Sequence, residues 1–452
     1  MRGWTRLLVG LALIPLFTVG VAGAAGGNSL AGWKITILPV DARAASSFSE
    51  PGVAAGRDGL LVENACTANT GSPSTFWLSH DDGKTWSHGF SVGSSAIGCG
   101  DSDAAAGSDG YLYSLTLGTG VDVYRSHDGK AWQGPAMFPP PHGVDQPDRP
   151  WLVLIPNRPN EVLMFNSEVG GNAVMWRSVD HAATFSGPVL VTGGSNSQAA
   201  LALGSRPLVD PTNNSRMYLF YETAGEPGLV QSVNSSGPSQ FPLTQLWVAT
   251  SDDGGQHWSN QLVLDVTTAF GVGEGSLGHL LPATTIDSAG NRYVVLSVRL
   301  GAATTTHLFL IHSTRYGAWS KPVKVDSGTE SNVFPAVAVA RQGHLFVSWY
   351  GSTAKDFNDP HARWTEMFAA TTEGLAAHPR FAILRLSGAE PVHVGAVDNM
   401  GAIGFDIGQN WALRDFQSVT VDGCGHAHVT WAADYKSPRT YAATTIPFCP
   451  AG

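Results

Sequence analysis

The stretch Ser79-His80-Asp81-Asp82-Gly83-Lys84-Thr85-Trp86 follows the pattern Ser-x-Asp-x-Gly-x-Thr-Trp, and weaker copies of it return along the chain. A carboxylate and hydroxyls at these positions can bond nearby backbone N–H groups, glycine can take a positive φ, and the aromatic ring can be buried. The pattern therefore predicts a rigid β-turn that satisfies its own polar groups, and not a catalytic site. The later copies lie at 126–132, 178–185, 251–258, 313–319 and 371–374.

A second repeated unit, a small polar turn followed by an apolar strand, lies upstream of these turns. Its copies lie at 58–62, 109–113, 160–164, 215–219, 290–295, 343–347 and 425–429. Each is flanked by further short strands, so one repeat predicts a four-stranded antiparallel blade, and the spacing is that of a β-propeller. We expect an all-β, seven-bladed propeller, with six blades as the alternative if one unit is an insertion.

The last repeat lacks its outer strand, since it supplies only strands at 416–421, 426–431 and 440–446. The apolar segment 33–38 near the N-terminus is the predicted replacement. Pairing the two chain ends in one blade would close the ring and remove its free edges.

The N-terminus predicts export. Arg2 and Arg6 precede an apolar run at 7–21 and the small residues Ala22-Gly23-Ala24, which is the pattern of a secretory signal peptide. We expect residues 1–24 to be removed and residues 25–452 to form one propeller domain outside the cell. No other segment is long and apolar enough to span a bilayer.

The net charge limits the classes of binding partner, and the cysteine content indicates the cellular compartment. A net charge of -10 excludes nucleic acid and anionic membranes as expected partners, because both require a cationic surface. The four cysteines suit an oxidising compartment and contain no C-x-x-C pair. Three pairings are open, and we favour the one that joins neighbouring segments: Cys66 with Cys99, and Cys424 with Cys449.

The direction of the strands predicts which face carries function. The aspartate-containing turns and the turns between first and second strands share one face, so substrate contacts are expected on the other. The polar residues expected there are Glu50, Glu63, Asn64, Asp101, Asp103, Asp148, Arg149, Glu168, Tyr221, Glu222, His279, Arg299, Asn332, Tyr350, Arg414 and Asp415. The glycine-rich connection 391–411, with His393, is expected on the same face.

Each of these residues also has a structural interpretation. Asp148 and Asp415 either cap strand starts or contact substrate, while Arg149 and Arg414 either pair with those aspartates or bind an anion. Asp101 and Asp103 share a proton, bind calcium or are solvated. The histidines show no metal-ligand spacing, so we predict no metal or cofactor, with calcium as the one alternative.

These features resemble the secreted Asp-box (BNR-repeat) β-propeller proteins of the sialidase superfamily over essentially the whole mature chain. The resemblance implies a substrate carboxylate held by three arginines, a tyrosine nucleophile backed by glutamate, and an aspartate acid/base. Arg149, Arg299 and Arg414 are the matching cations, and Tyr350 with Glu222 is the matching pair.

One family element is absent. The family's first arginine lies in an R-I-P element that opens blade one, where this chain has Ser49-Glu50-Pro51-Gly52. The nearest similar segment, Asp148-Arg149-Pro150-Trp151, comes two blades later.

Three functions remain open at this stage. The first is a glycoside hydrolase, exo-sialidase-like, with Asp101, Asp103 or Asp148 as acid/base and Arg149, Arg299, Arg414 and Asp415 on the substrate. The second is a non-catalytic propeller that binds a glycan or protein. The third is a polysaccharide lyase in which tyrosine, histidine and arginine remove a proton beside a neutralised uronate. We expect a monomer with an extracellular glycan partner; the sequence does not name the sugar.

Overall fold

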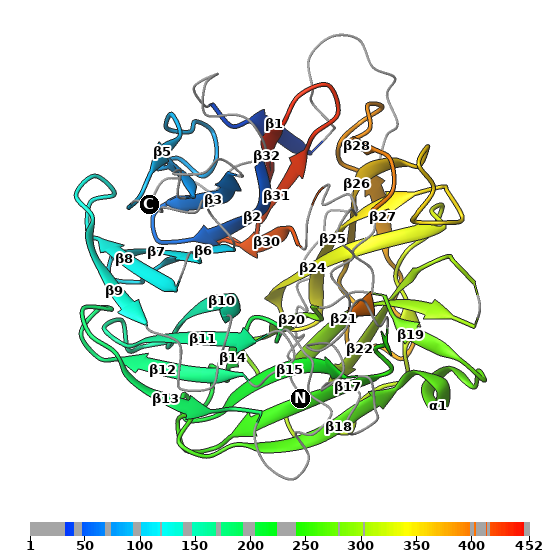
Figure 1. Ribbon diagram of the computed structural model, residues 1–452, viewed down its shortest axis with the longest axis horizontal. Helices are drawn as coiled ribbons and strands as arrows, with labels where there is room; N and C mark the ends of the chain where they lie inside the picture. The colour runs from blue at the N-terminus through cyan, green and yellow to red at the C-terminus, as the bar shows by residue number, and fades with distance from the viewer. Residues whose placement is uncertain are drawn as a thin grey trace, which may run out of the picture.

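The computed structural model describes residues 32–39, 48–67, 74–93, 101–117, 120–138, 147–168, 173–192, 204–223, 241–278, 281–301, 303–397, 402–403, 413 and 416–446. It is a seven-bladed β-propeller of four-stranded antiparallel sheets, with almost no helix. The innermost strands surround the centre of the ring, and the blades radiate from it (Figure 1). The predicted fold class is confirmed, and the six-bladed alternative is wrong.

Each blade uses four strands in order from the centre outward. The innermost strands are β2 (Phe48–Ala55), β6 (Ser102–Ala106), β10 (Pro147–Leu154), β14 (Leu208–Val209), β20 (Ala283–Ile286), β24 (Ser331–Arg341) and β30 (Ser418–Val421). The second strands are β3 (Leu61–Thr67), β7 (Leu112–Leu117), β11 (Val162–Glu168), β15 (Met217–Thr223), β21 (Arg292–Leu300), β25 (His344–Ser352) and β31 (Ala427–Ala433).

The outer half of each blade completes the sheet. The third strands are β4 (Thr75–Ser79), β8 (Val121–Ser126), β12 (Val174–Ser178), β17 (Gln245–Ser251), β22 (His307–Ser313), β26 (Arg363–Thr371) and β32 (Arg439–Thr445). The outermost strands are β5 (Phe90–Ser91), β9 (Gln133–Phe138), β13 (Ser186–Leu190), β18 (Ser259–Asp265), β23 (Val323–Lys324), β27 (Ala382–Arg385) and β1 (Trp33–Ile37).

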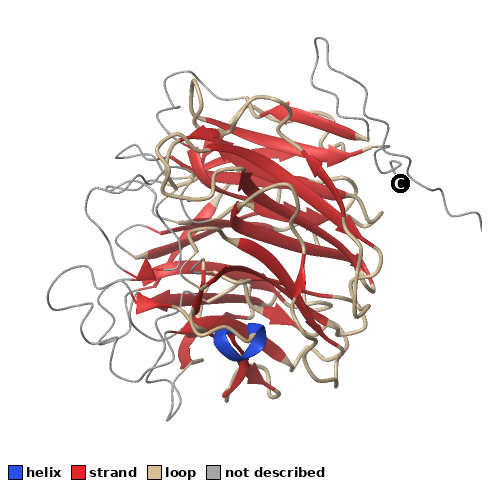
Figure 2. Cartoon of the chain, turned by 90° about the vertical axis from the view of Figure 1, so that its right-hand side faces the viewer, coloured by secondary structure: helices blue, strands red, loops and turns tan. Residues whose placement is uncertain are grey.

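A few short elements decorate the ring. β16 (Phe241–Pro242) pairs with β29 (Ala402–Ile403), β19 (Gly275–Leu277) with β21, and β28 (His393–Val394) with β26. The helix α1 (Val266–Phe270) lies at the edge of the strand layers in the side view (Figure 2). Among the described residues, no helix has the length and apolar character needed to cross a membrane.

The two ends of the chain meet in blade seven, as predicted. β1 pairs with β32 in an antiparallel register that sets Trp33 opposite Thr445 and Ile37 opposite Tyr441. Trp33 is buried, and its ring packs edge-on against Phe368 of blade six at a centroid distance of 4.7 Å. The N-terminal strand therefore both completes the last sheet and packs against its neighbour.

The aspartate turns satisfy their own polar groups. In the first, Ser79 Oγ donates to Asp81 Oδ1 at 2.9 Å and accepts from the N–H of Gly83 at 2.9 Å. Asp81 Oδ1 also accepts from the N–H of Thr85 at 2.8 Å, and Oδ2 accepts from Thr85 Oγ1 at 2.6 Å. The same serine-to-aspartate bond recurs from Ser126, Ser178 and Ser251. The predicted local role of these residues is confirmed.

Replacing Asp81 by alanine is expected to reduce the free energy of unfolding by about 1–2 kcal/mol, because several turn donors lose their acceptor, as at a lost helix N-cap. Urea denaturation would measure this. Lys84→Ala, an exposed position in the same turn, is the control and should change stability by less than about 0.5 kcal/mol. Equal effects of the two variants would contradict this role for Asp81.

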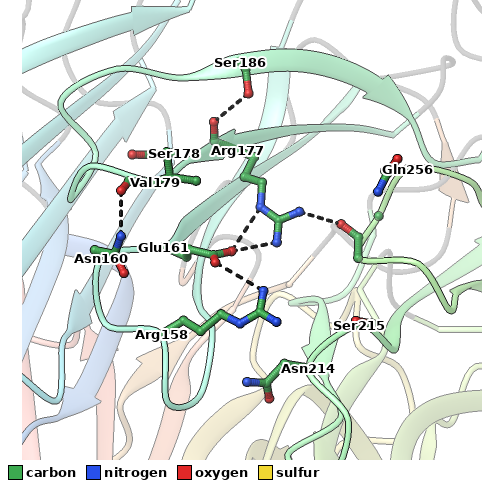
Figure 3. Close-up of polar contacts among 12 residues, drawn as sticks. Arg158, Asn160, Glu161, Arg177, Ser178, Val179, Ser186, Asn214, Ser215 and Gln256 are labelled. Atoms are coloured by element: carbon green, nitrogen blue, oxygen red, sulfur yellow. Dashed lines mark hydrogen bonds and ion pairs between the residues drawn. The ribbon is translucent and has the colours of Figure 1, made fainter.

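Arginines link the aspartate turns of adjacent blades. Arg177 of β12 binds Glu161 of its own blade at 2.7 Å and donates to the carbonyl of Gly254 in the next turn at 3.0 Å (Figure 3). Arg125 of β8 donates in the same way to the carbonyls of Asp180 and His181. On the face that carries the aspartate turns, these two arginines therefore join neighbouring blades.

The turns between first and second strands lie on the same face as the aspartate turns. The N–H of Asp82 donates to the carbonyl of Gly59, and the N–H of His181 to that of Asn160. Gly254 and Gly374 bond the corresponding turns of their own blades. The predicted assignment of faces is thus confirmed for the described turns, and the opposite face remains the candidate for function.

Candidate functional site

On the face opposite the aspartate turns, the described residues are mainly those at the ends of strands. Five predicted positions cannot be located there: His279, Arg414 and Asp415 lie outside the described residues, as do the side chains of Asp148 and Glu168. Their roles stay predictions. The other candidates can be placed, and they divide into groups at different seams between blades.

The first group lies between blades two and three. Asp101 accepts the N–H of Arg149 through Oδ2 at 2.7 Å, and its Oδ1 lies 3.7 Å from the Arg149 guanidinium. Asp103 accepts the N–H of Ala104 at 2.9 Å and that of Leu152 at 2.8 Å. Both carboxylates are therefore engaged with the backbone that joins the two blades.

Arg206 completes this group, and the sequence analysis missed it. Its guanidinium binds Asp103 and donates to the carbonyl of Leu152 at 3.1 Å. The signal was present, since Arg206-Pro207 repeats the Arg-Pro dipeptide of Arg149-Pro150 just before an innermost strand. Only the fold shows that Arg149 pairs with Asp101 and Arg206 with Asp103 in the same group.

Residues before proline form bulges in several innermost strands. Glu50, Arg149 and Phe334 each precede a proline, each has a positive φ (52°, 46° and 52°), and the strand register shifts at each one. This conformation is costly for residues with a Cβ and persists only where surrounding contacts enforce it. The Glu50-Pro51 segment thus adopts the same geometry as Arg149-Pro150, although it carries an acid in place of an arginine.

Arg149 stacks between two rings near the centre of the propeller. Its guanidinium carbon lies 3.7 Å from the ring centroids of both Trp151 and Phe416. Trp151 belongs to blade three and Phe416 precedes the innermost strand of blade seven, so these contacts cross the ring. Leu281 packs against Phe416 from blade five. Arg149, at 1% exposure, is part of a central plug.

Glu222 lies in a separate apolar layer. It is 1% exposed, and its Oε2 has no hydrogen-bond partner among the described residues. Burial raises the pKa of its carboxyl well above the usual range, because the charged form loses its hydration. Tyr221, the preceding residue, donates its hydroxyl to Asn260 at 2.9 Å, and burial raises its pKa.

Tyr350 lies at the seam of blades six and seven, away from Glu222. Its hydroxyl accepts the N–H of Ala432 at 2.9 Å. Burial, and next the carboxyl of Glu366, raise the pKa of this hydroxyl well above its usual range. Glu366 lies opposite Tyr350 in the strand register, and neither of its carboxyl oxygens has a partner among the described residues. Sequence analysis missed Glu366 because its proximity depends on that register.

A histidine and an aspartate adjoin this seam. His393 Nδ1 lies 2.8 Å from Asp434 Oδ1, and its Nε2 lies 3.3 Å from the carbonyl of Ala396. The charge of Asp434 also acts on Tyr350. The side chain of Asp434 is 40% exposed, so the His–Asp pair reaches solvent while Tyr350 stays buried.

Three of the remaining candidates form hydrogen bonds within the fold, and one, Arg299, has no ion pair among the described residues. Glu63 accepts from Thr430 Oγ1 of blade seven at 3.0 Å, Asn64 donates to Ser102 Oγ at 2.6 Å, and Asn332 bonds Thr306 and Trp349. Arg299, at the end of β21, differs from these. It is half-buried, its Nε has no hydrogen-bond partner, and it has no ion pair among the described residues.

The structure thus brings together Asp101, Asp103 and Arg149, but it places Tyr350, Glu222 and Arg299 in three other blades: six, four and five. Chemically, the first group consists of two aspartates that bind backbone N–H groups and arginines between blades. The Tyr350 seam combines weakly acidic groups with a His–Asp pair, and Arg299 offers a positive charge without an ion pair among the described residues. One further group can be considered for metal binding: Asp82, Asp422 and His426, on the opposite face.

Cys66 and Cys424 are both disulfide-bonded, and the described residues include no free cysteine. Cys99 and Cys449 lie outside the described part of the chain. The predicted pairing of Cys66 with Cys99 and of Cys424 with Cys449 therefore stays a prediction.

Comparison with solved structures finds other propellers at low sequence identity. A polysaccharide lyase, the PL25 ulvan lyase, has a TM-score of 0.53 and 10% identity over 88% of this chain and 94% of its own. The lectin BP39L from Burkholderia pseudomallei has a TM-score of 0.51 and 10% identity over 86% of this chain and 96% of its own. The NanB sialidase from Streptococcus pneumoniae has a TM-score of 0.46 and 12% identity over 68% of this chain and 66% of its own.

At these identities the likeness shows the fold alone. No protein-family model matches the chain, and no curated protein matches it.

Proposed function

We propose that this chain is an exported propeller that binds an acidic glycan without cutting it, using the face opposite the aspartate turns. The observation that carries the proposal is the state of Asp101 and Asp103. An acid/base catalyst needs a carboxyl within reach of substrate, whereas these two hold backbone N–H groups and arginines between blades. The lectin and the ulvan lyase with the same fold both involve carbohydrates, by their names.

Arg299 is the proposed contact with the acidic group of the glycan. A half-buried guanidinium without an ion-pair partner can bind a carboxylate or sulfate with two parallel hydrogen bonds. The net charge of -10 opposes this contact only weakly, since charges further than about 8 Å away are screened at physiological ionic strength.

We also propose the features that follow from export. These are removal of residues 1–24, the two disulfides Cys66–Cys99 and Cys424–Cys449, and a monomeric domain over 25–452. The sialidase-superfamily resemblance, through its Asp-box turns, supports the glycan assignment. Peptide mapping of the secreted protein without reduction would test the cleavage site and both pairings.

The test of the proposed function is binding of the purified protein to uronate-containing, sialylated, sulfated and neutral oligosaccharides, followed by calorimetry on the best ligand. Arg299→Gln is expected to raise Kd for an acidic ligand roughly 10- to 100-fold, since a hydrogen bond to a charged group contributes about 1.5–3 kcal/mol. Arg341→Gln, an exposed arginine beside the opposite-face turn, should leave Kd unchanged. Equal binding of acidic and neutral glycans would sink the proposal.

An enzyme acting on the same glycan is the second candidate, and the cluster of Tyr350, Glu366, His393 and Asp434 favours it. The histidine paired with Asp434 can act as a base, and Glu366, whose pKa is raised by burial, can act as an acid. Products of hydrolysis and of elimination should be assayed in the binding mixtures. Product formation abolished by Tyr350→Phe and by His393→Gln would establish the enzyme and overturn the non-catalytic assignment.

A further inference from the structure

Four side chains of types that can bind a metal ion meet where blade one joins blade seven, on the face opposite the proposed glycan site. They are Asp82 in the first aspartate turn, and Asp422, His426 and His428 in and after the turn between β30 and β31. We call them the seam cluster. The two blades lie side by side in the ring (Figure 1), and the contact between them closes the ring.

The ligand atoms of the seam cluster face one another. His428 Nε2 lies 3.2 Å from Asp422 Oδ2 and 3.4 Å from Asp82 Oδ1. His426 Nδ1 lies 3.4 Å from Asp422 Oδ2 and 4.0 Å from Asp82 Oδ2. Asp82, Asp422 and His426 each offer one atom within 4.8 Å of the others. In a tetrahedron with metal–ligand distances of about 2.0–2.1 Å, neighbouring ligand atoms lie roughly 3.3 Å apart.

Contacts behind the cluster orient its ligands. Asp422 Oδ1 accepts the N–H groups of Cys424 at 2.8 Å and His426 at 2.9 Å, so Oδ2 is the oxygen directed at the histidines. His428 is 1% exposed, and its Nδ1 lies 3.0 Å from Thr444 Oγ1, which turns Nε2 toward both aspartates. A hydrogen-bonded second nitrogen is the usual arrangement for a histidine that binds metal.

One further observation points to a ligand, and a second explains the position of Asp82. The Nδ1 atom of His426 is buried and has no hydrogen-bond partner among the described residues, although it faces two carboxylates. Gly83 has a φ of +77°, and a Cβ there would lie 2.5 Å from Thr444 Oγ1. The first aspartate turn is therefore brought close to β32, which holds Asp82 against the histidines.

We propose that the seam cluster is a structural site for a divalent transition metal of the zinc class, which joins the first and last blades. Two imidazoles and two carboxylates suit zinc, and four protein ligands leave no open position for catalysis. Calcium is not the expected ion, because it prefers six to eight oxygen ligands. The site is independent of the proposed glycan function.

The test uses the full purified protein, stripped with a chelator, dialysed and titrated with Zn²⁺ alone. Calorimetry should show one equivalent bound, and Tm should rise with Zn²⁺ and return to its metal-free value with EDTA. Co²⁺ should give the visible absorption of a tetrahedral centre. Ca²⁺ should change neither the heat nor Tm.

The matched variants are His426→Gln and His257→Gln. His426 belongs to the seam cluster and its side chain is 24% exposed, so its loss should be tolerated, whereas Kd for Zn²⁺ should rise at least roughly tenfold. His257 forms an exposed pair with Asp253 in another aspartate turn, and its variant should bind as the wild type does. No Zn²⁺-dependent rise in Tm, or equal Zn²⁺ affinity in His426→Gln and wild type, would overturn the site and leave a network of His–Asp ion pairs.

Discussion

Asp103→Ala is expected to destabilise the propeller by about 3–5 kcal/mol, because each buried N–H group left without an acceptor costs about 1–3 kcal/mol and the ion pair with Arg206 is lost as well. The carboxylate is 1% exposed and binds the N–H groups of Ala104 and Leu152 as well as the guanidinium of Arg206. Its loss leaves two buried N–H groups without an acceptor and removes hydrogen bonds that join blade two to blade three. Urea denaturation of the purified variant measures this directly.

The control for Asp103 is Asp122→Ala. Asp122 lies on β8 of the same blade, is half-buried and has no hydrogen bond or ion pair among the described residues, so its removal should cost less than about 1 kcal/mol. If Asp103→Ala retains its stability but loses ligand binding or turnover, the carboxylate contacts the ligand, and the structural role argued here is wrong. The comparison thus separates a structural role of Asp103 from a role in ligand contact.

The second large effect is a fall in stability as the pH rises above about 5. Burial raises the pKa of Glu63, Glu222 and Glu366 well above the model-compound value of 4.5. Between 4.5 and each raised pKa, the folded protein keeps a proton that the unfolded chain has released. The free energy of unfolding therefore falls with pH there, by about 1.4 kcal/mol per pH unit for each glutamate.

Glu222→Met and Glu366→Met should flatten this dependence, because neither carboxyl has a full set of partners and methionine fills a similar volume. We expect each variant to exceed the wild type in stability at pH 9 by more than at pH 5. Urea denaturation at both values checks this, with the exposed Glu274→Met as control. Parallel pH profiles for Glu222→Met, Glu366→Met and the wild type would show that these carboxyls ionise without cost in the fold.

At acidic pH, below about 4, stability is expected to fall as the pH falls. Burial alone would raise the pKa of Asp180, but hydrogen bonds from Thr184 outweigh it and lower the pKa to about 2. A lowered folded-state pKa gives stability that is present above the unfolded pKa and is lost as the pH falls. The aspartate turns therefore weaken in acid while the buried glutamates weaken the fold in alkali.

The sequence by itself determined the repeating architecture. Turn patterns such as Ser79–Trp86 act within a few residues, where propensity and local hydrogen bonds decide the conformation. The seven copies of the polar turn that precedes an apolar strand gave the blade count. The apolar segment 33–38 supplied the missing strand because only one edge remained unpaired. These features depend on short-range chemistry and on the number of repeats, and both can be read from a sequence.

The tertiary structure alone decided which candidate side chains meet. Arg206 and Asp103 are separated by 103 residues, Tyr350 and Ala432 by 82, and Glu63 and Thr430 by 367. A polar group at a strand end can face the centre, either neighbouring blade or solvent, and a shift of one residue in register reverses its direction. The central stacking of Arg149 and the seam cluster of Asp82 with His428 arise only when the ring closes, because that closure alone brings distant blades into contact.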